Sequence, residues 1–307
     1  MHTQHLPKTK DIYSGLDRIP TGKASERLTE GCLVLEGGAF RGLYTQGFLD
    51  AMMLRDLNLS CVIGVSAGAL GGISYVSGQI GRSARTNLTY RHDSRYVGGK
   101  ALLHSGSILD VGFLTEDRGI HEPLDEERFF RPEQRFVAVA TECRSARPTY
   151  FEKGKCKDIF LAIRASASLP YLTPMVMIEG RPYLDGACSC PIPYQWAIDE
   201  GYTKIIVLRT REARFRKQPS NMKTAAHLYR EYPAFAEKLA NGDRLYNAQC
   251  AELEKLHKEG RLLQISPSRK VTVSRIEKDM EKLGNLYWLG YQDCLDKWEE
   301  LQEYLFS

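Results

Sequence analysis

The sequence of 307 residues has no apolar run long enough to span a bilayer, and its first 30 residues lack the apolar core of a signal peptide. It also has no low-complexity tract and no repeat of fixed period. Hydrophobic residues make up 43% of the chain and charged residues 26%, which is ordinary for a soluble globular protein. We therefore expect a cytoplasmic protein, for which any membrane contact would be peripheral, at the inner membrane surface.

Strong charge of one sign and close cysteine clusters are missing as well. The net charge of +4 is too weak to indicate nucleic-acid binding. Among the eight cysteines, Cys188 and Cys190 form the only close pair. No second pair or histidine cluster stands at zinc-site spacing, so we expect reduced structural thiols, no metal site and no other cofactor.

What the sequence does contain is an alternation of short apolar segments with helical ones. Helices are predicted at 43–57 and from Ala67, and strands at 31–36, 61–65, 135–143, 148–152 and 204–210. Such alternation is typical of an α/β fold with a mainly parallel central sheet.

Composition divides the chain into three parts. Residues 1–30 form a polar N-terminal segment, residues 31–215 the α/β core, and residues 216–307 a charged helical extension. Within the extension, 262–266 is predicted to be a late strand that returns to the core.

The end of the extension has the pattern of an amphipathic helix. Apolar residues recur at three- and four-residue steps from Leu283 to Leu305. Because glycine weakens helices, we expect Gly284 and Gly290 to mark a break near the start of this helix.

A lone hydroxyl stands between two glycines where a predicted strand turns into a helix, in Gly64-Val65-Ser66-Ala67-Gly68. This is the pattern of a nucleophile elbow, in which the serine takes a strained conformation that exposes its Oγ. Glycines flank it because a Cβ at either position would collide with the neighbouring strand and helix. A five-residue match also arises by chance, so its context has to decide.

A second glycine-rich turn, Glu36-Gly37-Gly38-Ala39-Phe40-Arg41-Gly42, lies between the first strand and its helix. Free backbone N–H groups and a helix N-terminus make such a loop suitable for a phosphate or an oxyanion. Ala39 stands where a dinucleotide fingerprint needs glycine, and no G-K-[ST] follows, so neither nucleotide motif fits.

The serine needs a base, and two kinds are available. His227 and His257 follow Ser66 but lie in charged helical segments, which is a poor setting for a triad base. Asp185 ends a predicted strand before Gly186. An aspartate at that place is ordinary turn chemistry, yet it can act as a base if it faces Ser66 in a dry cleft, where burial raises its pKa.

Three further segments have roles that the residues leave open. The stretch 162–174 combines small residues with two prolines, and we expect it to support the Asp185 strand and the floor of the cleft. Residues 91–100 form either a lid or an ordinary surface loop. The basic residues of 209–217 bind a head group or an anionic surface, or form a solvated loop.

Taken together, these blocks resemble those of the patatin-like phospholipase family, in the family's order. The resemblance covers about residues 31–210, and the helical remainder is similar to an extension of some bacterial members. Four motifs carry it: Gly37 to Gly42 as oxyanion loop, Gly64 to Gly68 as nucleophile elbow, Ala165 to Pro174 as the A-S-x-x-x-P-x-x-x-P block, and Asp185-Gly186-Ala187 as the D-G-[AG] motif.

The resemblance implies a three-layer α/β/α fold and a catalytic dyad of Ser66 and Asp185. It assigns the oxyanion hole to the amides of Gly37, Gly38, Ala39 and Phe40, with Arg41, Gly42, Gly64, Gly68 and Gly186 as supporting motif residues. Ala39 departs from the third glycine often found in the loop.

The implied activity is metal-independent hydrolysis of carboxylic esters of lipids, such as phospholipids, lysophospholipids or other acyl esters. Two alternatives stay open: an acyltransferase that uses the same acyl-enzyme, and a non-catalytic lipid-binding member of the fold.

Overall fold

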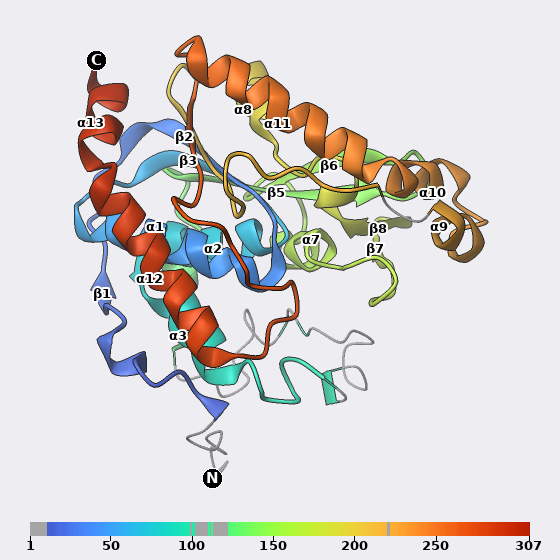
Figure 1. Ribbon diagram of the computed structural model, residues 1–307, viewed down its shortest axis with the longest axis horizontal. Helices are drawn as coiled ribbons and strands as arrows, with labels where there is room; N and C mark the ends of the chain where they lie inside the picture. The colour runs from blue at the N-terminus through green and yellow to red at the C-terminus, as the bar shows by residue number, and fades with distance from the viewer. Residues whose placement is uncertain (1–10, 99, 102–109, 111, 113–121, 220–221) are drawn as a thin grey trace.

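The computed structural model describes residues 11–98, 100–101, 110, 112, 122–219 and 222–307. Figure 1 shows a central sheet with helices on both sides. The strands are β1 Gly22–Lys23, β2 Thr29–Leu35, β3 Leu59–Val65, β4 Gln79–Ile80, β5 Arg135–Glu142, β6 Arg147–Glu152, β7 Val176–Ile178, β8 Arg181–Asp185, β9 Ile205–Leu208 and β10 Leu263–Ile265.

The helices of the first two thirds of the chain are α1 Gly42–Leu54, α2 Ala67–Val76, α3 Arg82–Tyr90, α6 Glu126–Phe129, α7 Ile159–Ser166 and α8 Tyr194–Asp199. The remaining α-helices are α9 Met222–Leu228, α10 Pro233–Ala240, α11 Gly242–Lys258, α12 Met280–Asp296 and α13 Trp298–Phe306. Short 3-10 helices are η2 Leu16–Arg18, η3 Ala39–Arg41 and η4 Gly186–Cys188. Within the described residues, no helix is long and apolar enough to cross a membrane.

The main sheet is mixed and mostly parallel, with the order β10-β9-β2-β3-β5-β8-β7 and β6 also paired to β5. The pairs from β10 to β5 are parallel, and those made by β6, β7 and β8 are antiparallel. The predicted fold class is confirmed, and the late strand β10 pairs with β9 at one edge of the sheet.

Side-chain alternation along the strands explains the three layers. In β2, Leu33 and Leu35 face one apolar core, which also contains residues of α1, α2, α3 and α12. Cys32 and Val34 face the other core, which includes residues of α8 and α11. Because the central strands are buried on both faces, they read as continuous apolar runs in the sequence.

The two glycines near the start of α12 do not break it, so that expectation is wrong. Helix α12 continues from Met280 to Asp296 and packs along α1. A Cβ at Gly290 would lie 1.9 Å from the carbonyl oxygen of Tyr44 in α1, and one at Gly284 would lie 2.2 Å from the Tyr13 ring. These glycines permit close approach, and the helical segment ends at Lys297, where α13 follows.

Candidate active site

Strand register brings Ser66 and Asp185 to the same level of the sheet. Val65, the last residue of β3, pairs with Val139 of β5, and the next residue of β5, Ala140, pairs with Asp185 at the end of β8. Ser66 and Asp185 therefore stand on either side of β5, about two strand spacings of roughly 4.8 Å apart along the sheet. Two residues separated by more than a hundred positions in sequence thus meet at one edge.

Ser66 has the strained backbone of an elbow, with φ 56° and ψ −122°. A Cβ at Gly64 would lie 2.5 Å from the amide nitrogen of Ala69 in α2, and one at Gly68 would lie 2.4 Å from the carbonyl oxygen of Leu35 in β2. Both flanking glycines are therefore required by backbone atoms, which cannot move aside as a flexible side chain can. The expected steric reason for the motif is present.

The backbone of Ser66 is fixed by a residue that the sequence analysis gave no polar role. Its N–H donates to the Oγ of Ser166 at 2.9 Å. Ser166 ends α7, inside the stretch 162–174, and is fully buried. A serine in a small-residue block gives no local sign of such a contact, because its partner lies 100 residues away.

Asp185 is 2% exposed, and its surroundings hold it in place. Its Oδ1 accepts from the N–H of Ala187 at 2.8 Å, and its own N–H donates to the carbonyl of Ser168 at 2.8 Å. The stretch 162–174 therefore supports the Asp185 strand, as expected.

Burial raises the pKa of the Asp185 carboxyl to about 6. The Ala187 amide and the nearby Ser66 hydroxyl oppose that rise, and so do the more distant charges of Arg275 and Lys217. A carboxyl with this pKa is a stronger base than an exposed aspartate and is still mostly ionised at neutral pH.

The glycine-rich loop lies against the elbow. A Cβ at Gly37 would lie 3.1 Å from the Cβ of Ser66. Within the described residues, the N–H groups of Gly37, Gly38 and Ala39 have no hydrogen-bond partner, whereas that of Phe40 donates to the carbonyl of Arg275 at 3.4 Å. The loop thus presents unsatisfied amides near the Ser66 side chain.

Ala39 takes a left-handed backbone conformation, with φ 49°. This conformation favours glycine, which explains why a third glycine is common at that place. The turn tolerates alanine at a conformational cost of about 1–2 kcal/mol.

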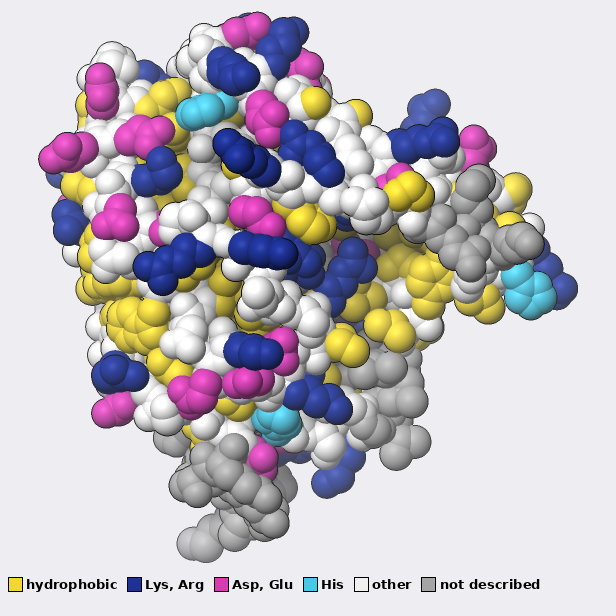
Figure 2. Space-filling view, in the orientation of Figure 1, with side chains coloured by type: hydrophobic (Ala, Val, Ile, Leu, Met, Phe, Trp, Pro, Cys, Tyr) yellow, Lys and Arg dark blue, Asp and Glu magenta, His cyan; other side chains and the backbone are white. Residues whose placement is uncertain are grey.

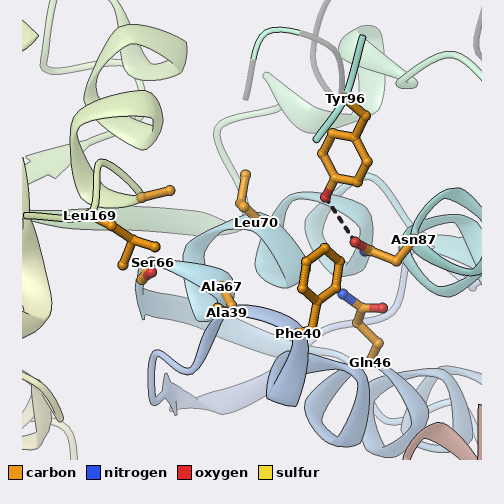
Figure 3. Close-up of a pocket in the computed structure, with 10 residues that line it drawn as sticks. Ala39, Phe40, Gln46, Ser66, Ala67, Leu70, Asn87, Tyr96 and Leu169 are labelled. Carbon is orange, nitrogen blue, oxygen red and sulfur yellow. Dashed lines mark hydrogen bonds between the residues drawn. The ribbon is translucent and has the colours of Figure 1, made fainter. Parts of the chain in front are cut away.

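A narrow pocket of about 40 Å³ opens beside Ser66. Figure 3 shows Ser66 at one side, Phe40 and Leu70 in the middle, and Gln46, Asn87 and Tyr96 on the far side. Apolar side chains dominate the part next to Ser66, which suits an acyl chain.

The far side of the pocket receives Tyr96 from the segment 91–100. This side chain is buried and its hydroxyl donates to Asn87 Oδ1 at 2.8 Å. Tyr96 therefore does not belong to an ordinary surface loop, and a lid formed by this segment stays a prediction; residue 99 lies outside the described residues.

Other predicted side chains lie elsewhere. His227 is exposed on α9, and the Nδ1 of His257 on α11 accepts from the Gln264 amide at 3.4 Å.

One residue of the basic segment 209–217 departs from the expectation of a solvated loop or an anion-binding surface. Arg209 is fully buried, and its guanidinium donates to the Tyr246 hydroxyl and to the carbonyl of Ala213.

A central sheet covered by helices on both faces, with a strained serine at the carboxyl end of one strand, is the architecture of patatin-like proteins. Residues 33–198 match the family described as patatin-like phospholipase, and the chain belongs to that family. Residues 232–306 match a second family, described only as a domain of unknown function.

Curated relatives share the core. The chain is 30% identical over 183 residues to the uncharacterized protein YjjU of Escherichia coli, covering 58% of this chain and 51% of that protein. It is 28% identical over 178 residues to an uncharacterized NTE family protein of Mycobacterium tuberculosis, covering 56% and 46%. A probable lipid hydrolase of Invertebrate iridescent virus 6 is 25% identical over 187 residues, covering 54% and 62%.

The chain spans about half the length of the first two relatives. Among solved structures, VipD from Legionella pneumophila aligns with a TM-score of 0.48 and 15% identity, covering 91% of this chain and 68% of that one. Membership of a lipid-hydrolase family thus rests on the family match.

Proposed function

We propose that this protein is a serine hydrolase that cleaves carboxylic esters of lipids through an acyl-enzyme on Ser66. The observation that carries the proposal is the meeting of a strained Ser66 with a buried Asp185 of raised pKa, beside an apolar pocket. The family match and the description of the viral relative as a probable lipid hydrolase support a lipid substrate.

In the proposed first step, Ser66 Oγ attacks the ester carbonyl and its proton passes to Asp185. A bond forms between Oγ and the carbonyl carbon, and the negative charge moves to the carbonyl oxygen. The unsatisfied amides of Gly37, Gly38 and Ala39 are the candidate donors for that oxyanion. The Phe40 amide is the weaker candidate, because it already donates to Arg275.

In the second half, the tetrahedral intermediate collapses and the alcohol leaves with the proton held by Asp185. Water then attacks the acyl group on Ser66 and gives one proton to Asp185. The bond to Ser66 Oγ breaks, Asp185 returns the proton to Oγ, and the carboxylic acid is released. No step calls on a metal ion, so we expect turnover to persist in the presence of a chelator.

Labelling with a fluorophosphonate, read by intact mass and peptide mapping, tests this proposal. We expect one adduct on Ser66 in the native protein and none in Ser66→Ala, while Ser145→Ala, at an exposed turn, labels like the native protein. Asp185→Asn should fold but label far more slowly. Absence of an adduct on the folded native protein would favour a non-catalytic lipid-binding role.

A further inference from the structure

Four cations gather near the candidate active site, and three of them lie outside the segment that matches the patatin-like family. We call Arg41, Arg211, Lys217 and Arg275 the cation cluster. Arg41 belongs to the glycine-rich loop, Arg211 and Lys217 follow β9, and Arg275 lies between β10 and α12. Figure 2 shows Lys and Arg side chains in the middle of the face that this last segment crosses, next to a hollow bordered by hydrophobic side chains.

Arg41 is close enough to the other three cations for their charges to repel, and Lys217 is also close to Arg275. Burial, followed by the charges of Arg211 and Arg275, lowers the pKa of Arg41 to about 10. Burial also lowers the pKa of Lys217, followed by the charges of Arg275 and Arg41. Holding like charges together costs free energy unless an anion lies among them.

The side chains around the cluster do not neutralise its positive charge. Within the described residues, no member of the cation cluster forms an ion pair with a carboxylate. Glu36 is the nearby acid whose charge reaches Arg41 and Lys217, and its Oε2 already accepts from the Thr210 amide at 2.6 Å.

Several donors in the cluster are unused. The Nε atoms of Arg41 and Arg211 are buried without a hydrogen-bond partner, and Arg41 is only 8% exposed. Arg211 stacks over Phe215 at 4.5 Å and the Lys217 ammonium over Tyr246 at 4.4 Å, contacts that leave N–H groups free. A buried guanidinium with an unsatisfied N–H is a group that a ligand can complete.

The cluster also has a path to solvent and lies close to the reacting groups. It runs from buried Arg41 through half-buried Lys217 to exposed Arg275. The charges of Lys217 and Arg275 reach the carboxylate of Asp185, and the Arg275 carbonyl accepts from the Phe40 amide of the loop. A ligand bound here would lie next to an ester carbonyl placed on Ser66.

We propose that the cation cluster is an anion subsite that receives the phosphate group of a phosphorylated acyl ester. The proposal rests on the proposed function and adds to it the residues that discriminate a phosphorylated ester from a neutral one. Guanidinium groups suit phosphate because they donate parallel N–H bonds to two of its oxygens. The segments beyond the family match thereby contribute Arg211, Lys217 and Arg275 to substrate selection.

Two soluble substrates that differ only in the phosphate test this subsite: hexanoyl-glycerol phosphate and hexanoylglycerol. Both are monomeric in solution, so adsorption to a lipid surface does not enter. We expect the native protein to favour the phosphorylated ester in kcat/KM by about tenfold or more, as for a charge-assisted contact. The double variant Lys217→Gln/Arg275→Gln should lose most of this preference, read as the ratio of the two kcat/KM values, because a change in the Asp185 pKa affects both substrates alike.

The matched control is Arg269→Gln/Lys270→Gln, which removes two exposed cations from the same segment between β10 and α12. It should keep the native preference, because neither charge is among the main influences on the pKa of Arg41, Lys217 or Asp185. The subsite is overturned if the native protein has no preference, or if Lys217→Gln/Arg275→Gln slows both substrates equally. Inhibition of hexanoylglycerol turnover by inorganic phosphate, without a preference between the esters, would assign the cluster to the free ion and overturn the substrate role.

Failure of the proposed function is recognised separately, because the native protein would then turn over neither ester faster than Ser66→Ala. In that case, calorimetric titration with inorganic phosphate still tests the cluster. Binding weakened about tenfold in Lys217→Gln/Arg275→Gln, and unchanged in Arg269→Gln/Lys270→Gln, would support the anion site. Equal binding to all three proteins would overturn it.

Discussion

Gly47 on α1 faces Tyr287 on α12 so closely that a Cβ on Gly47 would lie 2.0 Å from the Tyr287 carbonyl oxygen. Beside this contact, the Tyr287 hydroxyl donates to Asp50 Oδ2 at 2.9 Å, and the Tyr44 hydroxyl donates to Asp293 Oδ2 at 3.0 Å. The extension is therefore held to the core by backbone proximity and by buried hydrogen bonds. The same packing positions the segment that carries Arg275.

Gly47→Ala should destabilise the protein by about 3 kcal/mol or more, since the added methyl group meets backbone atoms and forces α1 and α12 apart. Denaturant unfolding at neutral pH measures this change. Gly71→Ala in α2 is the matched control, because its Cβ would meet only the Cγ of Gln46, at 3.7 Å. That variant should be neutral or slightly more stable, and an equal loss in both variants would contradict the packing argument.

Ser166→Ala should lower kcat more than it changes KM, because the Ser66 N–H loses its acceptor and the elbow loses a fixed point. The unsatisfied buried N–H should also cost about 1–3 kcal/mol of stability. Steady-state kinetics on a soluble ester, with unfolding measured in parallel, separates the two effects.

The control for this prediction is Ser168→Ala. It removes only a hydroxyl that donates to the Arg164 carbonyl and keeps the Ser168 carbonyl that accepts from Asp185. We expect near-native kcat. A kcat in Ser166→Ala as high as that in Ser168→Ala would mean that the bond to Ser66 has no part in positioning the nucleophile.

The kcat/KM of hydrolysis should rise with pH through about 6, the pKa to which burial raises Asp185. Below that value the carboxyl is protonated and cannot accept the Ser66 proton. A pH series on an uncharged ester measures the acidic limb. A rate that is flat down to about pH 4, where an exposed aspartate titrates, would contradict Asp185 as the base.

Removing nearby positive charge should move this limb to higher pH. Lys217 and Arg275 favour the ionised form of Asp185, so Lys217→Gln/Arg275→Gln should raise its pKa. The same pH series on the control Arg269→Gln/Lys270→Gln should give the native limb. A limb unmoved in Lys217→Gln/Arg275→Gln would show that these charges do not act on Asp185.

Asp50 should make the protein less stable as the pH rises from about 4 to about 7. Burial raises the folded-state pKa of Asp50 to about 7, and the unfolded chain releases this proton near pH 4. Between these values the folded state binds more protons than the unfolded state, so raising the pH favours unfolding, by up to about 4 kcal/mol in total. Unfolding free energies measured at pH 4.5 and 7.5, which span most of this window, follow the change.

Asp50→Asn isolates this contribution. An amide can keep both partners, the Gly81 N–H and the Tyr287 hydroxyl, and does not titrate. The variant should therefore lose less stability over the same pH interval than the native protein. Asp17→Asn, at an exposed position, should behave like the native protein; identical pH dependence in all three would exclude Asp50 as the source.

The serine turn of the site could be predicted from the sequence, because its steric requirements are local. A strained serine turn requires small neighbours within two residues. Gly64, Ser66 and Gly68 can therefore be recognised as a motif in one short segment of the sequence. Strands buried on both faces appear as apolar runs, and the ends of the predicted strands differ from the observed ones by one or two residues. The expectation for Gly284 and Gly290 was wrong because glycine was judged by helix propensity alone, whereas here the partner helix decides.

By itself, the sequence determined the α/β layering, the elbow, the glycine-rich loop and the strand end at Asp185, because each depends on residues next to one another in the chain. The tertiary structure decided that β5 separates Ser66 and Asp185 by one strand, that Ser166 holds the Ser66 amide, and that a cation cluster forms beside them. These contacts join segments that lie far apart in the sequence. Their energies come from burial and charge proximity, which exist only once the chain has folded.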